Sequence, residues 1–248
     1  MSFSLVGWTE EVDSGTLTDI EALLDQHVTT DGDDILVPSF ASNIIGVFAF
    51  GVSITGAQIS SPTLRKGLML DVAPINAGAE PVFPLPFINR IDRPIALTPG
   101  EGLRGRASEG GAAATQVGVL AWLQGDYEEP PGGEILTVKA TSATTVAPYE
   151  WTLCPLSLTQ QLEAGRYALV GARVECANGI AARFVIPGSE YRPGVVACDA
   201  IGDTDGGIFR EGRFGMFGEF EHTFIPQVEV LAADADTAEV VYLDVIKI

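Results

Sequence analysis

Residues 115–123 read TQVGVLAWL, and residues 237–245 read TAEVVYLDV. Both stretches begin at a threonine and continue as apolar runs rich in β-branched and aromatic residues, a composition typical of buried strands. One stretch lies near the middle of the 248-residue chain and the other at its end. The pair therefore indicates two β-rich halves, each of which ends on a core strand.

Other candidate strands are separated by glycine, proline and acidic turns, a punctuation typical of short strands joined by loops. They cover residues 45–54, 66–72, 102–107, 117–124, 134–146, 166–175, 180–186, 194–199, 214–224, 228–232 and 239–248. The predicted fold class is all-β, with two β-sandwich lobes side by side and a short N-terminal helix.

The sequence DYEEPPGG at residues 126–133 has turn and linker chemistry and lies close to the middle of the chain. We place the lobe boundary there. The chain then divides into a helical arm of residues 1–34, a first lobe of residues 35–129 and a second lobe of residues 130–248.

The two halves share the order of several landmarks. An aromatic residue precedes an arginine by 17 positions in the first half, from Phe48 to Arg65, and by 16 in the second, from Tyr167 to Arg183. If the lobes are duplicated, Arg65 and Arg183 should occupy the same strand position, and each should pair with a carboxylate.

The predicted helix covers residues 17–28, where Leu17, Ile20, Leu23 and Leu24 share one helical face. This apolar stripe is narrow, and an isolated helix of this length is marginal in water. Either its own sandwich or a neighbouring subunit must therefore cover it. Removing the first 29 residues is predicted to impair assembly more than folding.

The charge balance limits the partners. The chain has 14 Lys and Arg against 33 Asp and Glu, a net charge of -19, which repels nucleic acids and disfavours acidic substrates. The first residues, MSFSLVGWTE, lack the basic and apolar regions of a signal peptide, and no apolar run is long enough to span a bilayer. Synthesis in the cytoplasm is expected.

The sequence carries no recognisable catalytic or cofactor motif. Two histidines, His27 and His222, are too few for a multi-histidine metal site. Cys154, Cys176 and Cys198 form no C-x-x-C pair and are expected to be buried free thiols. We therefore predict no enzyme activity, no catalytic residues, no cofactor and no metal site.

One pattern leaves an alternative open. In the predicted strand at residues 214–224, alternation puts Glu219 and Glu221 on one face, and Phe220 and Phe224 on the other. Paired carboxylates on one strand face occur in retaining glycosidases, although solvated acidic faces are far more common. The alternative function is a carbohydrate-binding or glycoside-acting β-sandwich with its site at Glu219 and Glu221.

The layout as a whole is a helix, two β lobes, a proline-rich excursion and no catalytic motif. It resembles the double jelly-roll major capsid proteins of tailless icosahedral viruses, especially membrane-containing bacteriophages. The resemblance covers residues 35–248 and rests on the landmarks quoted above. It implies two jelly rolls, a homotrimeric capsomer, a helix against the inner shell and a place in the virion capsid. The implied partners are other copies, other capsid proteins and, as a further candidate, an internal membrane.

Two segments are candidates for assembly contacts in such a shell. Residues 74–99 carry six prolines, so they are not expected to form central strands. The same segment is also rich in apolar residues that would pack poorly in an isolated loop. Intersubunit contact and a loop folded back over its own sandwich are equally compatible with this composition. The predicted contact residues are Leu17, Ile20, Leu24, Phe83, Leu85, Phe87 and Ile88.

Overall fold

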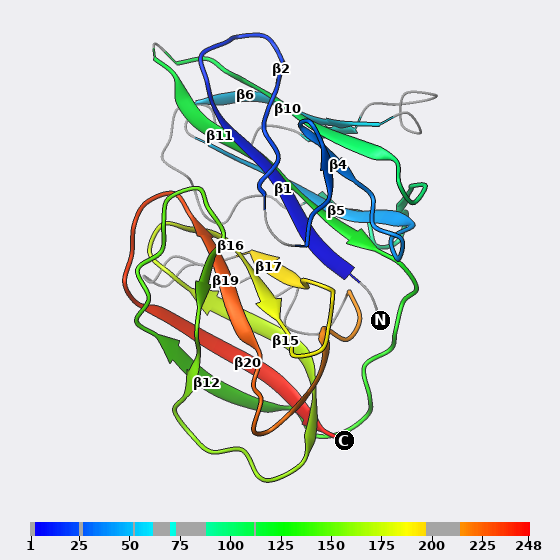
Figure 1. Ribbon diagram of the computed structural model, residues 1–248, viewed down its shortest axis with the longest axis vertical. Helices are drawn as coiled ribbons and strands as arrows, with labels where there is room; N and C mark the ends of the chain where they lie inside the picture. Colours follow the sequence, from blue (N-terminus) through cyan, green and yellow to red (C-terminus); the bar gives the residue numbers. More distant parts are fainter. Residues whose placement is uncertain are drawn as a thin grey trace. The chain divides into compact units, whose positions relative to one another are not determined.

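The computed structural model describes residues 3–24, 27–51, 53–61, 70–72, 88–111, 113–196 and 214–248. All the regular elements in these ranges are β-strands. The chain divides into two compact units (Figure 1). The N-terminal unit is Leu5–Gly125, and the C-terminal unit is Asp126–Ile248 together with the first four residues.

The N-terminal unit contains two antiparallel sheets. The first has the order β1-β11-β5-β8, with β9 also paired to β5, and the second has the order β3-β4-β10-β6-β7, with β2 also paired to β10. The strands are β1 (Phe3–Val12), β2 (Thr18–Asp19), β3 (Thr30–Asp31), β4 (Asp34–Leu36), β5 (Asn43–Gly51), β6 (Ile54–Ser60), β7 (Leu70–Val72), β8 (Ile88–Asn89), β9 (Ile95–Ala96), β10 (Gly102–Glu109) and β11 (Thr115–Gln124).

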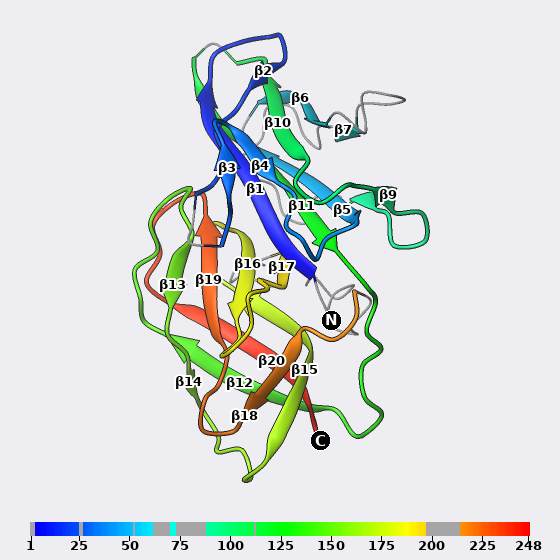
Figure 2. The ribbon, with the colours of Figure 1, turned by 45° about the vertical axis from the view of Figure 1, so that its right-hand side comes forward.

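The C-terminal unit also contains two antiparallel sheets, of order β14-β12-β20-β15-β18 and β13-β19-β16-β17 (Figure 2). The strands are β12 (Leu136–Ser142), β13 (Thr152–Cys154), β14 (Ser157–Leu158), β15 (Arg166–Glu175), β16 (Gly179–Val185), β17 (Gly194–Val196), β18 (Gly218–Glu221), β19 (Gln227–Ala232) and β20 (Glu239–Lys247). The all-β prediction is confirmed, and the four sheets are consistent with two sandwiches.

The two units share one strand order. The path β1-β11-β5-β8 corresponds to β12-β20-β15-β18, and the path β4-β10-β6-β7 corresponds to β13-β19-β16-β17. The corresponding strands also follow one another in the same order along the chain in both units. In both units the last strand of the chain order lies in the middle of its sheet: β11 lies between β1 and β5, and β20 lies between β12 and β15. The topology of one unit is therefore repeated in the other.

The two stretches quoted at the outset are the strands β11 and β20. Val117, Val119 and Ala121 of β11 belong to one hydrophobic cluster of the N-terminal unit. Leu120 and Trp122, on the opposite face of that strand, are fully buried too. A strand buried on both faces needs a continuous apolar run rather than an alternating one, which explains the sequence there.

The helix predicted over residues 17–28 is wrong in its described part, residues 17–24 and 27–28. Thr18 and Asp19 form β2, which pairs with β10. Beyond β2, the Ile20 amide donates to the Gly105 carbonyl at 3.1 Å, and the Leu23 amide donates to the Gly7 carbonyl at 2.8 Å. Ile20 and Leu23 are buried, as apolar spacing suggests, but neighbouring strands satisfy their backbone amides, so a helix is not required.

The sequence patterns missed strand β1, although it carries several of the largest core side chains. Leu5 and Trp8 are fully buried, and the Trp8 indole donates to the Asp33 carbonyl at 3.1 Å. Phe3, at the start of β1, belongs to the C-terminal unit and meets the rings of Phe214 and Phe217 edge to face. The first residues are therefore structural parts of both units.

The proposed repeat of arginines is described in one unit only. Arg183 is the fifth residue of β16 and pairs with Glu229 of β19, whereas Arg65 lies outside the described residues, so its pairing stays a prediction. The fifth residue of the corresponding strand β6 is Gln58, which lies opposite Arg106 of β10. In both units the fifth residue of the corresponding strand is thus a buried polar residue that lies opposite a charged residue.

Candidate functional site

The predicted assembly residues fall in different environments. Ile20 is fully buried within the N-terminal unit, Leu17 is partly buried, and Leu24 is 71% exposed. Phe83, Leu85 and Phe87 lie outside the described residues. The backbone of Ile88 pairs with Val47 in strands β8 and β5. Among the predicted assembly residues whose side chains the structure describes, Leu24 is the one that is largely exposed.

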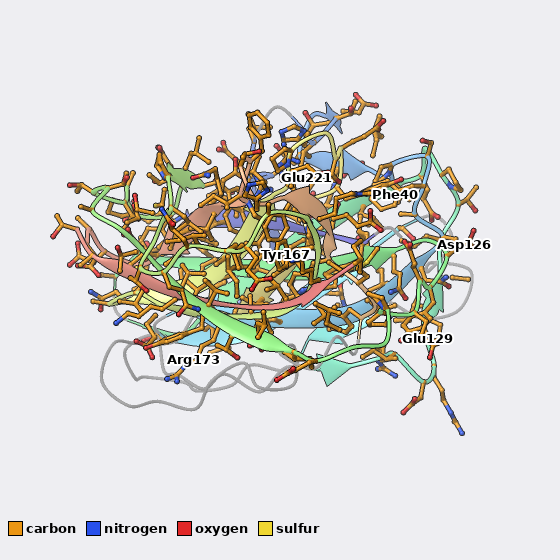
Figure 3. All side chains as sticks on the ribbon, turned by 90° about the horizontal axis from the view of Figure 1, so that it is seen from below. Phe40, Asp126, Glu129, Tyr167, Arg173 and Glu221 are labelled. Carbon is orange, nitrogen blue, oxygen red and sulfur yellow. The ribbon has the colours of Figure 1, made fainter. Side chains whose placement is uncertain are left out.

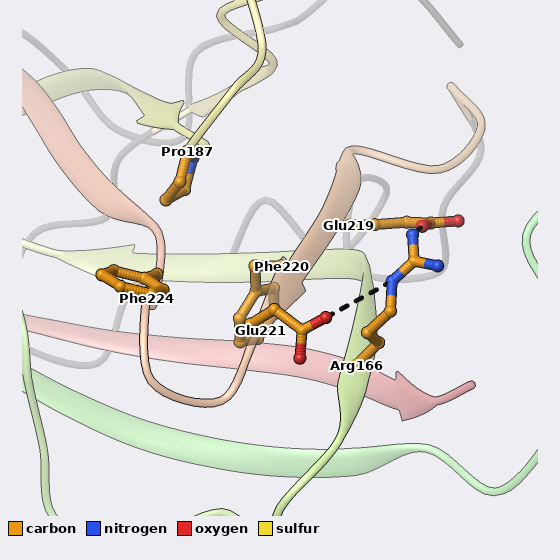
Figure 4. A pocket seen from close by; sticks show the side chains of 6 residues that line it. All are labelled: Arg166, Pro187, Glu219, Phe220, Glu221 and Phe224. Atoms are coloured by element: carbon orange, nitrogen blue, oxygen red, sulfur yellow. Dashed lines mark hydrogen bonds and ion pairs between the residues drawn. The ribbon is translucent and has the colours of Figure 1, made fainter.

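Glu219 and Glu221 lie on β18, at the end of a sheet in the C-terminal unit, beside the start of β15. The Arg166 guanidinium of β15 reaches both of them, bonded to Glu219 and 3.7 Å from Glu221 Oε1 (Figure 4). Between them along the strand, Phe220 points the other way and stacks on Tyr167, with ring centroids 5.8 Å apart. The two carboxylates therefore share one cation, which sequence spacing cannot reveal because Arg166 comes from far earlier in the chain.

Arg166, Glu219 and Glu221 line a surface hollow of about 440 Å³. Pro187 and Phe224 complete the lining (Figure 4). Phe224 is 68% exposed, contrary to the prediction of a longer strand that would turn it to the core. The strand ends at Glu221, and the Phe224 amide donates to the Glu221 carbonyl at 2.8 Å, which closes a turn. An aromatic ring is thus held on the rim of a polar hollow.

A second hollow, of about 350 Å³, shares Pro187 and Glu219 with the first. Its lining includes Glu128, Glu190 and Tyr191. The Met216 amide donates to the Glu128 carbonyl at 3.1 Å, which ties the segment after Asp126 to the residues just before β18. Together the two hollows form what we call the β18 groove, an acidic groove built within the C-terminal unit.

The interior of the same unit holds a polar cluster around Glu239. Burial raises the pKa of Glu239, the nearby Ser142 hydroxyl partly offsets the rise, and the charge of Asp236 adds to it. Burial also raises the pKa of the Cys154 thiol to about 12, and the pKa of Cys176 rises for the same reason. The prediction of buried free thiols is confirmed for Cys154 and Cys176, while Cys198 lies outside the described residues.

Of the residues labelled in Figure 3, Tyr167 is buried, and Asp126 and Glu129 are exposed. In the described ranges, no group of three or more His, Cys, Asp or Glu side chains is arranged to hold a metal ion. Within the same ranges, no helix is long and apolar enough to cross a bilayer.

No family model matches the sequence, and no curated protein does either. Solved structures match it over nearly its full length. The major capsid protein P2 from bacteriophage PM2 is 12% identical, with 99% of this chain and 98% of that chain covered and a TM-score of 0.28. The STIV MCP is 9% identical, with 97% of each chain covered and a TM-score of 0.24. A structure of Sulfolobus Turreted Icosahedral Virus gives 8% identity, 100% and 91% coverage and a TM-score of 0.25.

Proposed function

We propose that this protein is a major capsid protein, a structural subunit that self-assembles into the shell of an icosahedral virus. Each unit would be one jelly roll, and three chains would form a capsomer. The observation that carries the proposal is the repeated strand order, β1-β11-β5-β8 with β4-β10-β6-β7, then β12-β20-β15-β18 with β13-β19-β16-β17.

This order suits a jelly roll because the first and last strands of each repeated set lie side by side. Successive strands of each set alternate between the two sheets except at β6 and β7, and at β16 and β17, which pair with each other in one sheet. Jelly rolls of this kind occur in viral capsids, lectins and cupins. Cupin chemistry is disfavoured by the two histidines, which are far apart in sequence and lie in different units. Two such units in one chain give a building block with six similar lobes per trimer, which suits a hexagonal lattice.

The chemistry of the surface agrees with a shell role. Two-layer sandwiches bury their apolar faces and present few free edges, so they are stable carriers of contact loops. Apolar side chains remain on the described surface, including Leu24, Ile135 and Leu153. The net charge of -19 argues against direct contact with the genome, and favours a shell separated from nucleic acid by a membrane or by other proteins.

The test is the oligomeric state of the purified full chain. Size-exclusion chromatography with light scattering should give the mass of a trimer or of larger shells, and negative-stain images should show particles with three-fold symmetry. A strict monomer at millimolar concentration, in low and high salt, would contradict the proposal. Leu24→Ser is the sharpest variant, because it changes an exposed side chain and leaves the core intact. We expect it to lower the trimer fraction while the far-UV circular dichroism spectrum of the folded protein stays the same.

A further inference from the structure

We propose that the β18 groove binds a neutral oligosaccharide. The site is built from Arg166, Glu219, Glu221 and Phe224, and it continues past Pro187 into the second hollow beside Tyr191. This is a ligand-binding role, which goes beyond assembly of a shell and does not depend on it.

The size and lining of the groove suit a small ligand. Volumes of about 440 and 350 Å³ fall within the range of roughly 300–1,000 Å³ that is typical of ligand pockets. Apolar surfaces of Phe224 and Pro187 adjoin charged groups that can exchange hydrogen bonds. Because the two hollows share Pro187 and Glu219, a chain of linked sugar rings could extend from one into the other.

The polar groups select the chemical class. Arg166 offers N–H donors and the two glutamates offer acceptors, so neighbouring hydroxyls of a sugar can both accept and donate there. Arg166 already pairs with both carboxylates, so a lysine or arginine of a peptide would have to compete with it for the same oxygen atoms. A sugar hydroxyl can join this arrangement without breaking it. Glu128 and Glu190 add negative charge, so an anionic sugar is disfavoured.

The geometry also argues for binding rather than cleavage. In a retaining glycosidase, two carboxylates flank the scissile bond, one as nucleophile and one as acid. Here both carboxylates turn to a single guanidinium that lies between them (Figure 4). Arg166 therefore fills the space between the two carboxylates in which the reacting sugar carbon of a glycosidase substrate would have to lie.

The parts of the site are held before any ligand arrives. The bond from the Phe224 amide to the Glu221 carbonyl closes the turn. Two further bonds tie the turn to Gly165, the residue just before β15: the His222 amide donates to the Gly165 carbonyl at 3.0 Å, and the Gly165 amide donates to His222 Nδ1 at 3.3 Å. Such preorganisation reduces the entropy lost on binding. An exposed aromatic ring fixed beside a polar cluster is therefore better suited to a ligand than to solvent.

The experiment measures binding of defined sugars to the full-length protein by isothermal titration calorimetry. The probes are cellohexaose, maltohexaose, chitohexaose and mannohexaose, with hexalysine and an alginate hexamer as charged comparisons. We expect saturable binding of at least one neutral hexasaccharide. Phe224→Ala and Glu221→Ala should each weaken it by about tenfold, equivalent to roughly 1.4 kcal/mol.

The matched control is Leu153→Ala, which removes another exposed apolar side chain of the same unit, from β13 in the other sheet. Its affinity should equal that of the unchanged protein, and all three variants should keep the same melting temperature. Absence of binding to every neutral probe would overturn the proposal. So would binding that Phe224→Ala and Glu221→Ala leave unchanged, or binding of hexalysine alone.

Discussion

Arg183 and Glu229 face each other across strands β16 and β19, and Arg183 Nε donates to Glu229 Oε2 at 2.5 Å. Arg183 is fully buried, and its guanidinium carbon lies 4.3 Å from the centre of the Trp151 ring. A charge in the interior is tolerated only when a partner and an aromatic face replace its water. The pair therefore makes the packing of β16 on β19 specific.

Glu229→Gln should destabilise the C-terminal unit by about 3 kcal/mol, because it removes the carboxylate charge that pairs with the buried Arg183 guanidinium. Urea denaturation followed by fluorescence measures this, with Trp151 as the reporter in that unit. Glu221→Gln is the matched control, since its partner Arg166 is largely exposed, and it should change stability by less than about 0.5 kcal/mol. Equal effects of the two substitutions would show that the buried pair has no special role.

Gly105 lies so close to Trp8 that a methyl group does not fit. A Cβ atom built on Gly105 would lie 2.6 Å from Trp8 Cγ, a ring atom that cannot move without shifting the core. Gly105→Ala should therefore lower the melting temperature of the N-terminal unit, by overpacking that costs about 1–3 kcal/mol. Gly132→Ala serves as control because a Cβ there meets nothing within 4 Å. Calorimetry that finds both variants equally stable would contradict this packing.

Strands β11, β15 and β20 could be predicted from the sequence because continuous apolar, β-branched runs have few other stable arrangements. The spacing of Ile20 and Leu23 fits a helical face as well as it fits extended chain, so the sequence predicts a helix where the structure has none. Only the pairing of Ile20 with Gly105 and of Leu23 with Gly7 distinguishes the two structures, and those partners are distant in sequence. The same limit applies to the site, where alternation placed the two glutamates together but could not indicate Arg166.

Strand β1 changes what truncation should do. Its residues Leu5 and Trp8 are fully buried, so residues 1–29 contribute to the core of the N-terminal unit instead of forming a detachable arm. Deleting them should abolish the cooperative melt of that unit, since loss of one buried tryptophan alone costs about 3–5 kcal/mol. Thermal denaturation followed by circular dichroism tests this. A truncated protein that melts like the full chain would restore the view of a separate arm.

Because Cys154 and Cys176 are buried, we predict that their thiols react slowly with a disulfide reagent in the folded protein. Because only the thiolate reacts, the raised pKa values of Cys154 and Cys176 and their burial both protect them. In a Cys198→Ser background, the folded protein at pH 8 should react with a disulfide reagent far more slowly than the same protein in urea. The reagent's absorbance gives the rate directly. Rapid labelling of two thiols in the folded protein would mean that this interior opens readily.

Glu239 should make the C-terminal unit less stable as the pH rises. Burial raises its pKa above the ordinary value of 4.5, so the folded chain keeps a proton that the unfolded chain releases. Below the ordinary pKa both states are protonated, and the residue makes no difference. Between the ordinary and the raised pKa the unfolded state binds fewer protons, so the free energy of unfolding falls with increasing pH. Asp236 increases this effect, and Ser142 and Cys154 reduce it.

Glu239→Gln removes the titration while it keeps the shape of the side chain. Its unfolding free energy should match that of the unchanged protein near pH 4 and exceed it near pH 8, where the unchanged protein has lost the proton or keeps it at a cost. Urea denaturation at several pH values, followed through Trp151, gives both curves. Glu129→Gln, at an exposed position, should leave the pH dependence as it was. Parallel curves for Glu239→Gln and the unchanged protein would mean that Glu239 reaches water in the folded state, because a solvated carboxyl has no reason to hold its proton above the ordinary pKa.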